Sequence, residues 1–165
     1  MKKQIKKGAK KALKKTKKKA TSVAQKKSKT PKVIKGGLAI KSWKDACAYK
    51  GVNPNTLPDV SMIKDASLAG WVVAMYQMAI VTSAINENWE PDYTDGSYKY
   101  EPRFWIEKNP KTPSGFGFSD TLFDCTISYS YVGSRLCFRS NELRVHAQKF
   151  FKKLYQTIIL IDKKK

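Results

Sequence analysis

Residues 66–86 read ASLAGWVVAMYQMAIVTSAIN and contain no charged side chain. Apolar residues fall on most sides of a helix over this stretch, which predicts a helix buried in the core or at an oligomer seam. We expect it to start at Ser61 and to end at about Asn88. Its length approaches that of a membrane span. Five small or polar residues dilute the stretch and favour a core helix: Ser67, Gly70, Gln77, Thr82 and Ser83.

Two further helices are predicted, one on each side of this segment. A short helix covers residues 42–49, with Ser42 as its N-cap. A longer amphipathic helix runs from Asn141 to about Ile161 and is capped by Ser140. The apolar stripe of this last helix consists of Leu143, Ala147, Phe150, Phe151, Leu154 and Ile158.

The chain between the long helix and the C-terminal helix is predicted to form strands. A strand over residues 98–107 follows an acidic turn at residues 90–96. A hairpin is predicted from residues 122–131 and 134–139, with residues 132–133 at its turn, because this register sorts apolar and polar residues onto opposite faces. The expected fold class is therefore α+β, with a small antiparallel sheet whose β-hairpin packs against the long central helix and the C-terminal amphipathic helix.

Positive charge is concentrated at the N-terminus. The chain has 33 Lys+Arg against 13 Asp+Glu and a formal net charge of +20. Residues 1–37 hold 16 lysines and no acid, so they are predicted to be a disordered basic tail and linker in which the lysines repel one another. Residues 38–165 hold 17 basic and 13 acidic residues, a net charge of only +4, and are predicted to form a single α+β domain.

A lysine-rich segment of this kind is suited to a polyanion. Its ammonium groups displace counterions from a phosphate backbone, which gives an affinity that falls as salt rises. The tail has no arginine and no aromatic residue, the groups best suited to base reading and stacking, so binding is expected to be independent of nucleic-acid sequence. The tail residues predicted to contact nucleic acid are Lys2, Lys3, Lys6, Lys7, Lys10, Lys11, Lys14, Lys15, Lys17, Lys18, Lys19, Lys26 and Lys27.

Two alternatives stay open for the tail. It could meet another anionic surface, such as an acidic protein or a membrane, or it could serve only to keep the protein in solution. The scarcity of large apolar residues in the tail argues against membrane insertion.

The polar face of the predicted hairpin supplies two further candidate nucleic-acid contacts, Arg135 and Arg139. Lys99, Arg103 and Trp105 would join this face if the first strand pairs in the matching orientation. Arginines beside an exposed aromatic ring suit a single strand or a phosphate backbone. The competing interpretation is an ordinary polar sheet face, with Trp105 covered by a helix.

No catalytic group, metal site or cofactor is predicted, and the chain is not expected to be an enzyme. His146, the single histidine, is interpreted as a partly exposed helix residue. The acidic residues from Glu87 to Asp95 match no EF-hand spacing and are typical of a turn. The three cysteines are an odd number without a C-x-x-C pair, which indicates a reduced, intracellular setting rather than a disulfide framework.

Short motifs in the body occur in an order that resembles a known family. They are Ser42-Trp-Lys-Asp-Ala-Cys47, Leu57-Pro-Asp-Val-Ser61, Asn86-Glu-Asn-Trp-Glu-Pro-Asp92, Tyr98-Lys-Tyr100, Gly115-Phe-Gly-Phe-Ser119 and Val132-Gly-Ser-Arg-Leu-Cys-Phe138. Together they resemble an uncharacterised family of small proteins from phages and prophages of gut Bacteroidales. The resemblance covers about residues 42–160 and is most specific over residues 132–138. It implies a phage context and carries no catalytic residues.

The sequence thus predicts a non-enzymatic phage-type protein that binds nucleic acid non-specifically through its tail. The folded body is expected to dock on a protein partner, such as a phage virion protein, or to self-associate. The alternative is a virion structural or assembly protein whose tail faces the packaged genome. The expected location is the cytoplasm of an infected or lysogenic bacterial cell, or the virion itself.

Overall fold

The computed structural model describes residues 36–127 and 132–161, and residues 1–35 of the predicted tail lie outside this part of the chain. The described fold is α+β, in agreement with the sequence prediction. Its elements are the 3₁₀ helix η1 (Gly37–Ala39), α2 (Trp43–Lys50), α3 (Ala66–Ile85), β1 (Lys99–Lys108), β2 (Phe116–Thr126), the 3₁₀ helix η2 (Ser134–Leu136), α4 (Asn141–Phe150) and α5 (Lys152–Ile159).

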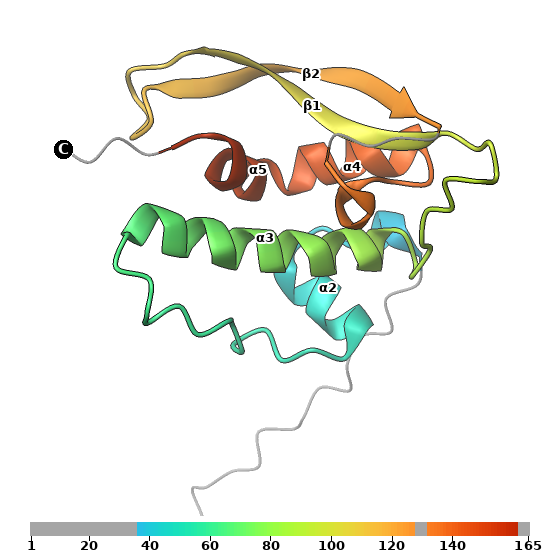
Figure 1. Ribbon diagram of the computed structural model, residues 1–165, viewed down its shortest axis with the longest axis horizontal. Coiled ribbons are helices and arrows are strands. Elements are labelled where there is room, and N and C mark those ends of the chain that lie inside the picture. Colours follow the sequence, from blue (N-terminus) through green and yellow to red (C-terminus); the bar gives the residue numbers. More distant parts are fainter. Residues whose placement is uncertain (1–35, 128–131, 162–165) are drawn as a thin grey trace, which may run out of the picture. The chain divides into compact units, whose positions relative to one another are not determined.

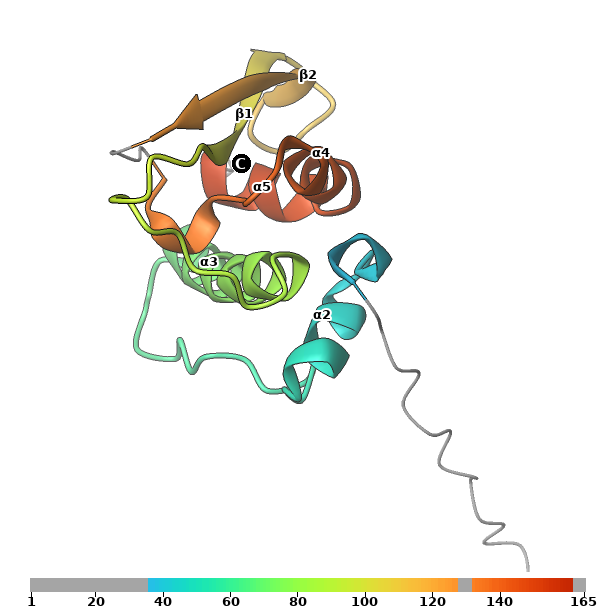
Figure 2. The ribbon, with the colours of Figure 1, turned by 90° about the vertical axis from the view of Figure 1, so that its right-hand side faces the viewer.

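The elements of the body are stacked in layers (Figures 1 and 2). The β1–β2 hairpin lies over α4 and α5, and α3 lies on the opposite side of that helix pair with α2 against it. The hairpin contacts α5 through aromatic rings: Phe104 stacks on Phe118 of β2 at 4.1 Å between ring centroids and meets Tyr155 of α5 at 4.9 Å. The C-terminal helices therefore form the middle layer of the body.

The central helix α3 begins at Ala66, five residues later than the predicted start at Ser61. The Asp65 carboxylate accepts hydrogen bonds from the N–H groups of Ser67 and Leu68 at 2.8 and 3.1 Å, so it caps the helix. The C-terminal half of α3 supplies core side chains from Met78 to Ile85, whereas its N-terminal half is more open. Among the described residues, α3 is the one helix long and apolar enough to span a membrane.

The β-hairpin forms earlier in the chain than predicted. β1 pairs antiparallel with β2, from Lys99 opposite Thr126 to Lys108 opposite Phe116, and residues 109–115 connect them. The predicted pairing of residues 122–131 with 134–139 is therefore wrong for the part that is described, since Ser134–Leu136 form η2. The physical reason is length: β1 offers β2 a ladder along ten residues, which the short 134–139 segment cannot match.

The predicted C-terminal helix is divided into α4 and α5. Its N-cap is Ser140, as predicted, but the helical geometry breaks at Phe151, where φ is −115° and ψ is 21°. The break turns Phe151 into the core while the adjacent Phe150 stays partly exposed against His146 at 4.6 Å between rings. Neither glycine nor proline marks this position in the sequence.

The folded body begins before the predicted boundary at residue 38. The Gly37 N–H donates to Glu87 Oε1 at 2.8 Å, and Gly37 is buried against the end of α3. Ile40, also fully buried, shares a 2.7 Å hydrogen bond between its carbonyl oxygen and His146 Nε2. His146 is therefore buried and not partly exposed as predicted, and it ties the start of the body to α4.

Candidate nucleic-acid interface and a polar pocket

Of the predicted nucleic-acid contacts, only Arg135 and Arg139 lie in the described part of the chain. They have different surroundings, since Arg135 lines a pocket and Arg139 is paired with Glu87. Arg139 Nη2 pairs with Glu87 Oε2 at 2.9 Å, and the Arg139 N–H donates to Asn86 Oδ1 at 3.2 Å. The guanidinium also holds the pKa of the Glu87 carboxyl below its usual range. Arg139 thus fastens the chain before α4 to the end of α3.

The predicted polar face of the hairpin does not form, because Arg135 and Arg139 are not on strands. Lys99 cannot join it either, since its side chain is fully buried and its ammonium lies 2.6 Å from Asp95 Oδ1. Trp105 is 57% exposed, so the alternative in which a helix covers this ring is also wrong. Arg103 is exposed on the same strand two residues before it.

The acidic loop forms the turns that the sequence predicted. Asp92 Oδ1 accepts from the Thr94 N–H at 2.8 Å, and Asp95 Oδ1 accepts from the Ser97 N–H at 2.8 Å. Within residues 36–127 and 132–161, no three His, Cys, Asp or Glu side chains come together as a metal site. Both carboxylates are thus engaged by their own loop.

The buried ammonium of Lys99 gives the acidic loop a pH dependence. Its hydrogen bond, and next that of the Ser97 N–H, lower the pKa of Asp95 from 3.8 to about 2. A carboxyl with a lowered folded pKa stabilises the fold fully above the unfolded pKa and loses this contribution as pH falls. We expect the free energy of unfolding of the wild type to fall between about pH 4 and pH 2, as Asp95 becomes protonated. The D95N variant lacks the contribution of this carboxylate and should be less stable than the wild type already at pH 5.

Urea unfolding between pH 5 and pH 2, followed by tryptophan fluorescence, measures this effect. Glu107→Gln, at an exposed position of β1, is the matched control and should follow the wild-type curve. Parallel curves for D95N and the wild type over this pH range would contradict the assignment.

Two thiols of the described fold, those of Cys47 and Cys137, are not prepared for nucleophilic chemistry. Both are buried outside any disulfide, and burial raises the pKa of each thiol. A reactive cysteine needs the opposite shift, because the thiolate is the nucleophile.

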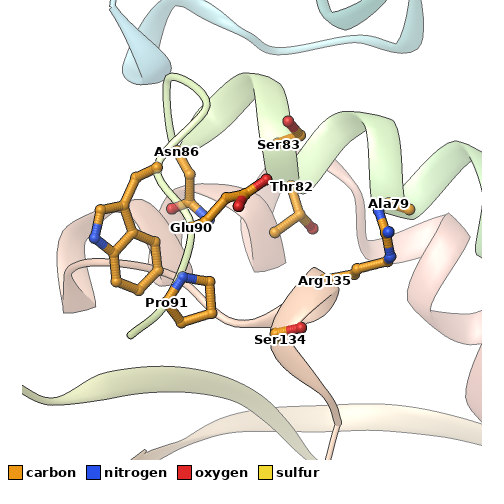
Figure 3. Close-up of a pocket in the computed structure, with 9 residues that line it drawn as sticks. Ala79, Thr82, Ser83, Asn86, Glu90, Pro91, Ser134 and Arg135 are labelled. Carbon is orange, nitrogen blue, oxygen red and sulfur yellow. The ribbon is translucent and has the colours of Figure 1, made fainter. Parts of the chain in front are cut away.

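Arg135 lines a pocket beside the C-terminal half of α3 (Figure 3). The pocket has a volume of about 210 Å³ and lies where η2 and the loop after α3 meet that helix. The residues that give it chemical character are Thr82, Asn86, Trp89, Glu90, Pro91 and Arg135. Sequence reasoning assigned Glu90 to a turn and found no role for Thr82 or Trp89.

The polar groups of this pocket differ in how far they are already engaged. Asn86 is held on both sides of its amide, because Nδ2 donates to the Cys137 carbonyl at 2.8 Å and Oδ1 accepts from Arg139. Thr82 is 1% exposed, and its hydroxyl has no hydrogen-bond partner among the described residues. Glu90 and Arg135 are exposed and make no ion pair with each other. The pocket therefore contains the Glu90 carboxylate as an acceptor, the Arg135 guanidinium as a donor and the buried Thr82 hydroxyl.

A second hollow, here named the apolar groove, lies between the start of α3 and the end of α5. It has a volume of about 490 Å³. Its apolar lining consists of Leu68, Trp71, Ile158, Ile159, Leu160 and Ile161. Several of these side chains are well exposed, Ile161 to 78%. Contiguous exposed apolar side chains of this kind mark interaction surfaces.

No protein-family model, curated protein or solved structure matches the chain.

Proposed function

We propose that the protein binds nucleic acid non-specifically through its lysine-rich N-terminal tail and self-associates through its folded body. The observation that carries the first part is the segregation of charge, since residues 1–37 hold 16 lysines and no acid while the rest of the chain has a net charge of +4. Lysine binds phosphate as a point charge and reads no base, so the tail supplies affinity without sequence choice.

Two cations of the body support the assignment of nucleic-acid binding to the tail. Arg139 is paired with Glu87, and the Lys50 ammonium donates to Asn88 Oδ1 and to Ser83 Oγ at 3.1 Å. These cations are engaged within the fold, whereas the tail has no acid of its own to pair with. If the resemblance to phage proteins reflects ancestry, the polyanion is a packaged or replicating phage genome.

The protein is expected to co-purify with nucleic acid at low salt and to release it at high salt. About 6–10 phosphate contacts, fewer than the number of tail lysines, would lower the affinity by about 10³–10⁵-fold between 50 and 200 mM salt. The ratio of absorbance at 260 and 280 nm, measured before and after a 1 M salt wash, reports this release. A preparation free of nucleic acid at low salt would contradict the proposal.

The apolar groove supports the second part of the proposal, with another copy of this chain as the occupant. In a two-fold dimer the same patch meets itself, so the exposed apolar side chains of the groove, such as Leu68 and Ile161, would pack against those of the second copy. The neighbouring helix suits such a contact because α3 contains no charged residue from Ala66 to Ile85, and the charged side chain that lines the groove is its N-cap, Asp65. Pairing two bodies would also bring two tails to one polyanion and raise the apparent affinity.

Leu68→Asp is expected to weaken this dimer by about 30-fold or more, because it places a carboxylate in an apolar seam. Sedimentation velocity over a concentration series measures the change. Met62→Asp is the matched control, since Met62 is 94% exposed and does not line the groove. A wild-type protein that stays monomeric at about 100 μM would overturn self-association.

A further inference from the structure

We propose that the pocket beside α3 binds an unpaired guanine base. The inference rests on the proposed function, which brings nucleic acid to the protein and leaves the body without a recognition role. The starting observation is the Thr82 hydroxyl, which is buried, lines the pocket and has no partner among the described residues. Buried hydroxyls are normally hydrogen-bonded, so this one indicates a site built for a polar ligand.

The charged groups of the pocket fit the edges of guanine. A guanidinium donates only, and its fork matches the O6 and N7 acceptors of guanine. A carboxylate accepts only, and it can take the neighbouring N1–H and N2–H groups of the same base. In the view of Figure 3, Thr82 lies between Glu90 and Arg135, where its hydroxyl can donate to O6 between the two edges.

The shape and setting of the pocket also suit a single base. Its volume of about 210 Å³ lies below the roughly 300–1,000 Å³ of pockets for drug-sized ligands. Trp89 and Pro91, both half-buried, supply apolar faces, and an aromatic ring is the usual stacking platform for an unpaired base. Adenine, cytosine and uracil do not carry two neighbouring N–H donors for a carboxylate next to a carbonyl acceptor for a guanidinium. They therefore cannot bond to Glu90 and Arg135 at the same time.

The test titrates guanosine into the ¹⁵N-labelled full chain and follows backbone amide and tryptophan Nε1–H shifts by NMR. Guanosine carries no phosphate, so the tail lysines do not contribute. We expect saturable shifts at Thr82, Trp89 and Arg135 with a Kd of the order of 1 mM, and at least fivefold weaker binding of adenosine, cytidine and uridine. Arg135→Gln and Glu90→Gln should each weaken guanosine about tenfold or more.

Arg103→Gln is the matched control, because Arg103 is exposed on β1 and does not line the pocket. Absence of saturable guanosine shifts, or equal affinity for all four nucleosides, would overturn the guanine site. Shifts produced by glycine but not by guanosine would overturn it in favour of a zwitterionic ligand. Each of these results would leave salt-dependent binding to duplex DNA intact, because the tail binds phosphates and the N1–H and N2–H groups of guanine are paired within a duplex, so the two proposals fail separately.

Discussion

A chain that begins at Gly36 is expected to bind duplex DNA about 10³-fold or more weakly than the full chain at 50 mM salt. The truncation removes all 16 lysines of the tail and keeps the contacts that Gly37 and Ile40 make with the body. With those lysines absent, counterion release no longer drives binding, and the net charge of the remaining residues is small.

Fluorescence anisotropy with a labelled duplex measures this loss, and circular dichroism confirms that the truncated chain is folded. Two full-length variants serve as matched controls. Replacement of the tail lysines by glutamine should reproduce the truncation, whereas replacement by arginine should retain the affinity, since charge is what the tail supplies. If truncation left the affinity unchanged, the tail would not be the binding element.

Gly37→Ala is expected to lower the free energy of unfolding by about 3 kcal/mol, at the upper end of the cost of overpacking. A Cβ at this position would lie 1.9 Å from the carbonyl oxygen of Ile85. The obstacle is backbone at the end of α3, so no side-chain rotation relieves the clash. η1 must move away, which strains the 2.8 Å hydrogen bond to Glu87 and the burial of Ile40.

Gly70→Ala is the matched control for this prediction. Gly70 lies inside α3 with open space where a Cβ would stand, so alanine should stabilise the fold by about 0.5–1 kcal/mol through helix propensity. Thermal unfolding by circular dichroism should show a Tm lower by about 10 °C for G37A and slightly higher for G70A. Equal Tm values for G37A and the wild type would contradict the docking of η1.

Local signals in the sequence predicted those parts of the fold that depend on neighbouring residues. Helix α2 has its N-cap at Ser42, as predicted, and the Ser42 hydroxyl accepts from the Asp45 N–H at 3.2 Å. Its C-cap is Gly51, in the left-handed conformation. The start of α3 was misplaced because Ser61 and Asp65 are both good caps, and only the fold decides between them.

The hairpin was mispredicted for a similar reason. Pairing residues 122–131 with 134–139 would place apolar and polar side chains on opposite faces without any other strand. In the structure β1 pairs with residues 116–126 instead, because it offers a longer hydrogen-bonded ladder. The break at Phe151 has no local marker, because it follows from packing two adjacent phenylalanines differently.

The pocket could not be found from the sequence, because its groups come from segments far apart in the chain. Thr82 and Arg135 come together only where η2 meets α3. In the sequence, the spacing of Arg135 and Arg139 suggested instead that both arginines lie on one strand. The charge of the tail, by contrast, depends on composition alone and needs no fold to be recognised.

The salt dependence of duplex binding by the full chain shows whether lysine charge alone drives the interaction. Two duplexes of equal length and unrelated sequence are titrated between 50 and 300 mM KCl. We expect one steep line of log K against log salt for both duplexes, with a slope of about −5 to −9 for roughly 6–10 phosphate contacts. A slope near zero, or affinities that differ more than about tenfold between the two sequences, would contradict it.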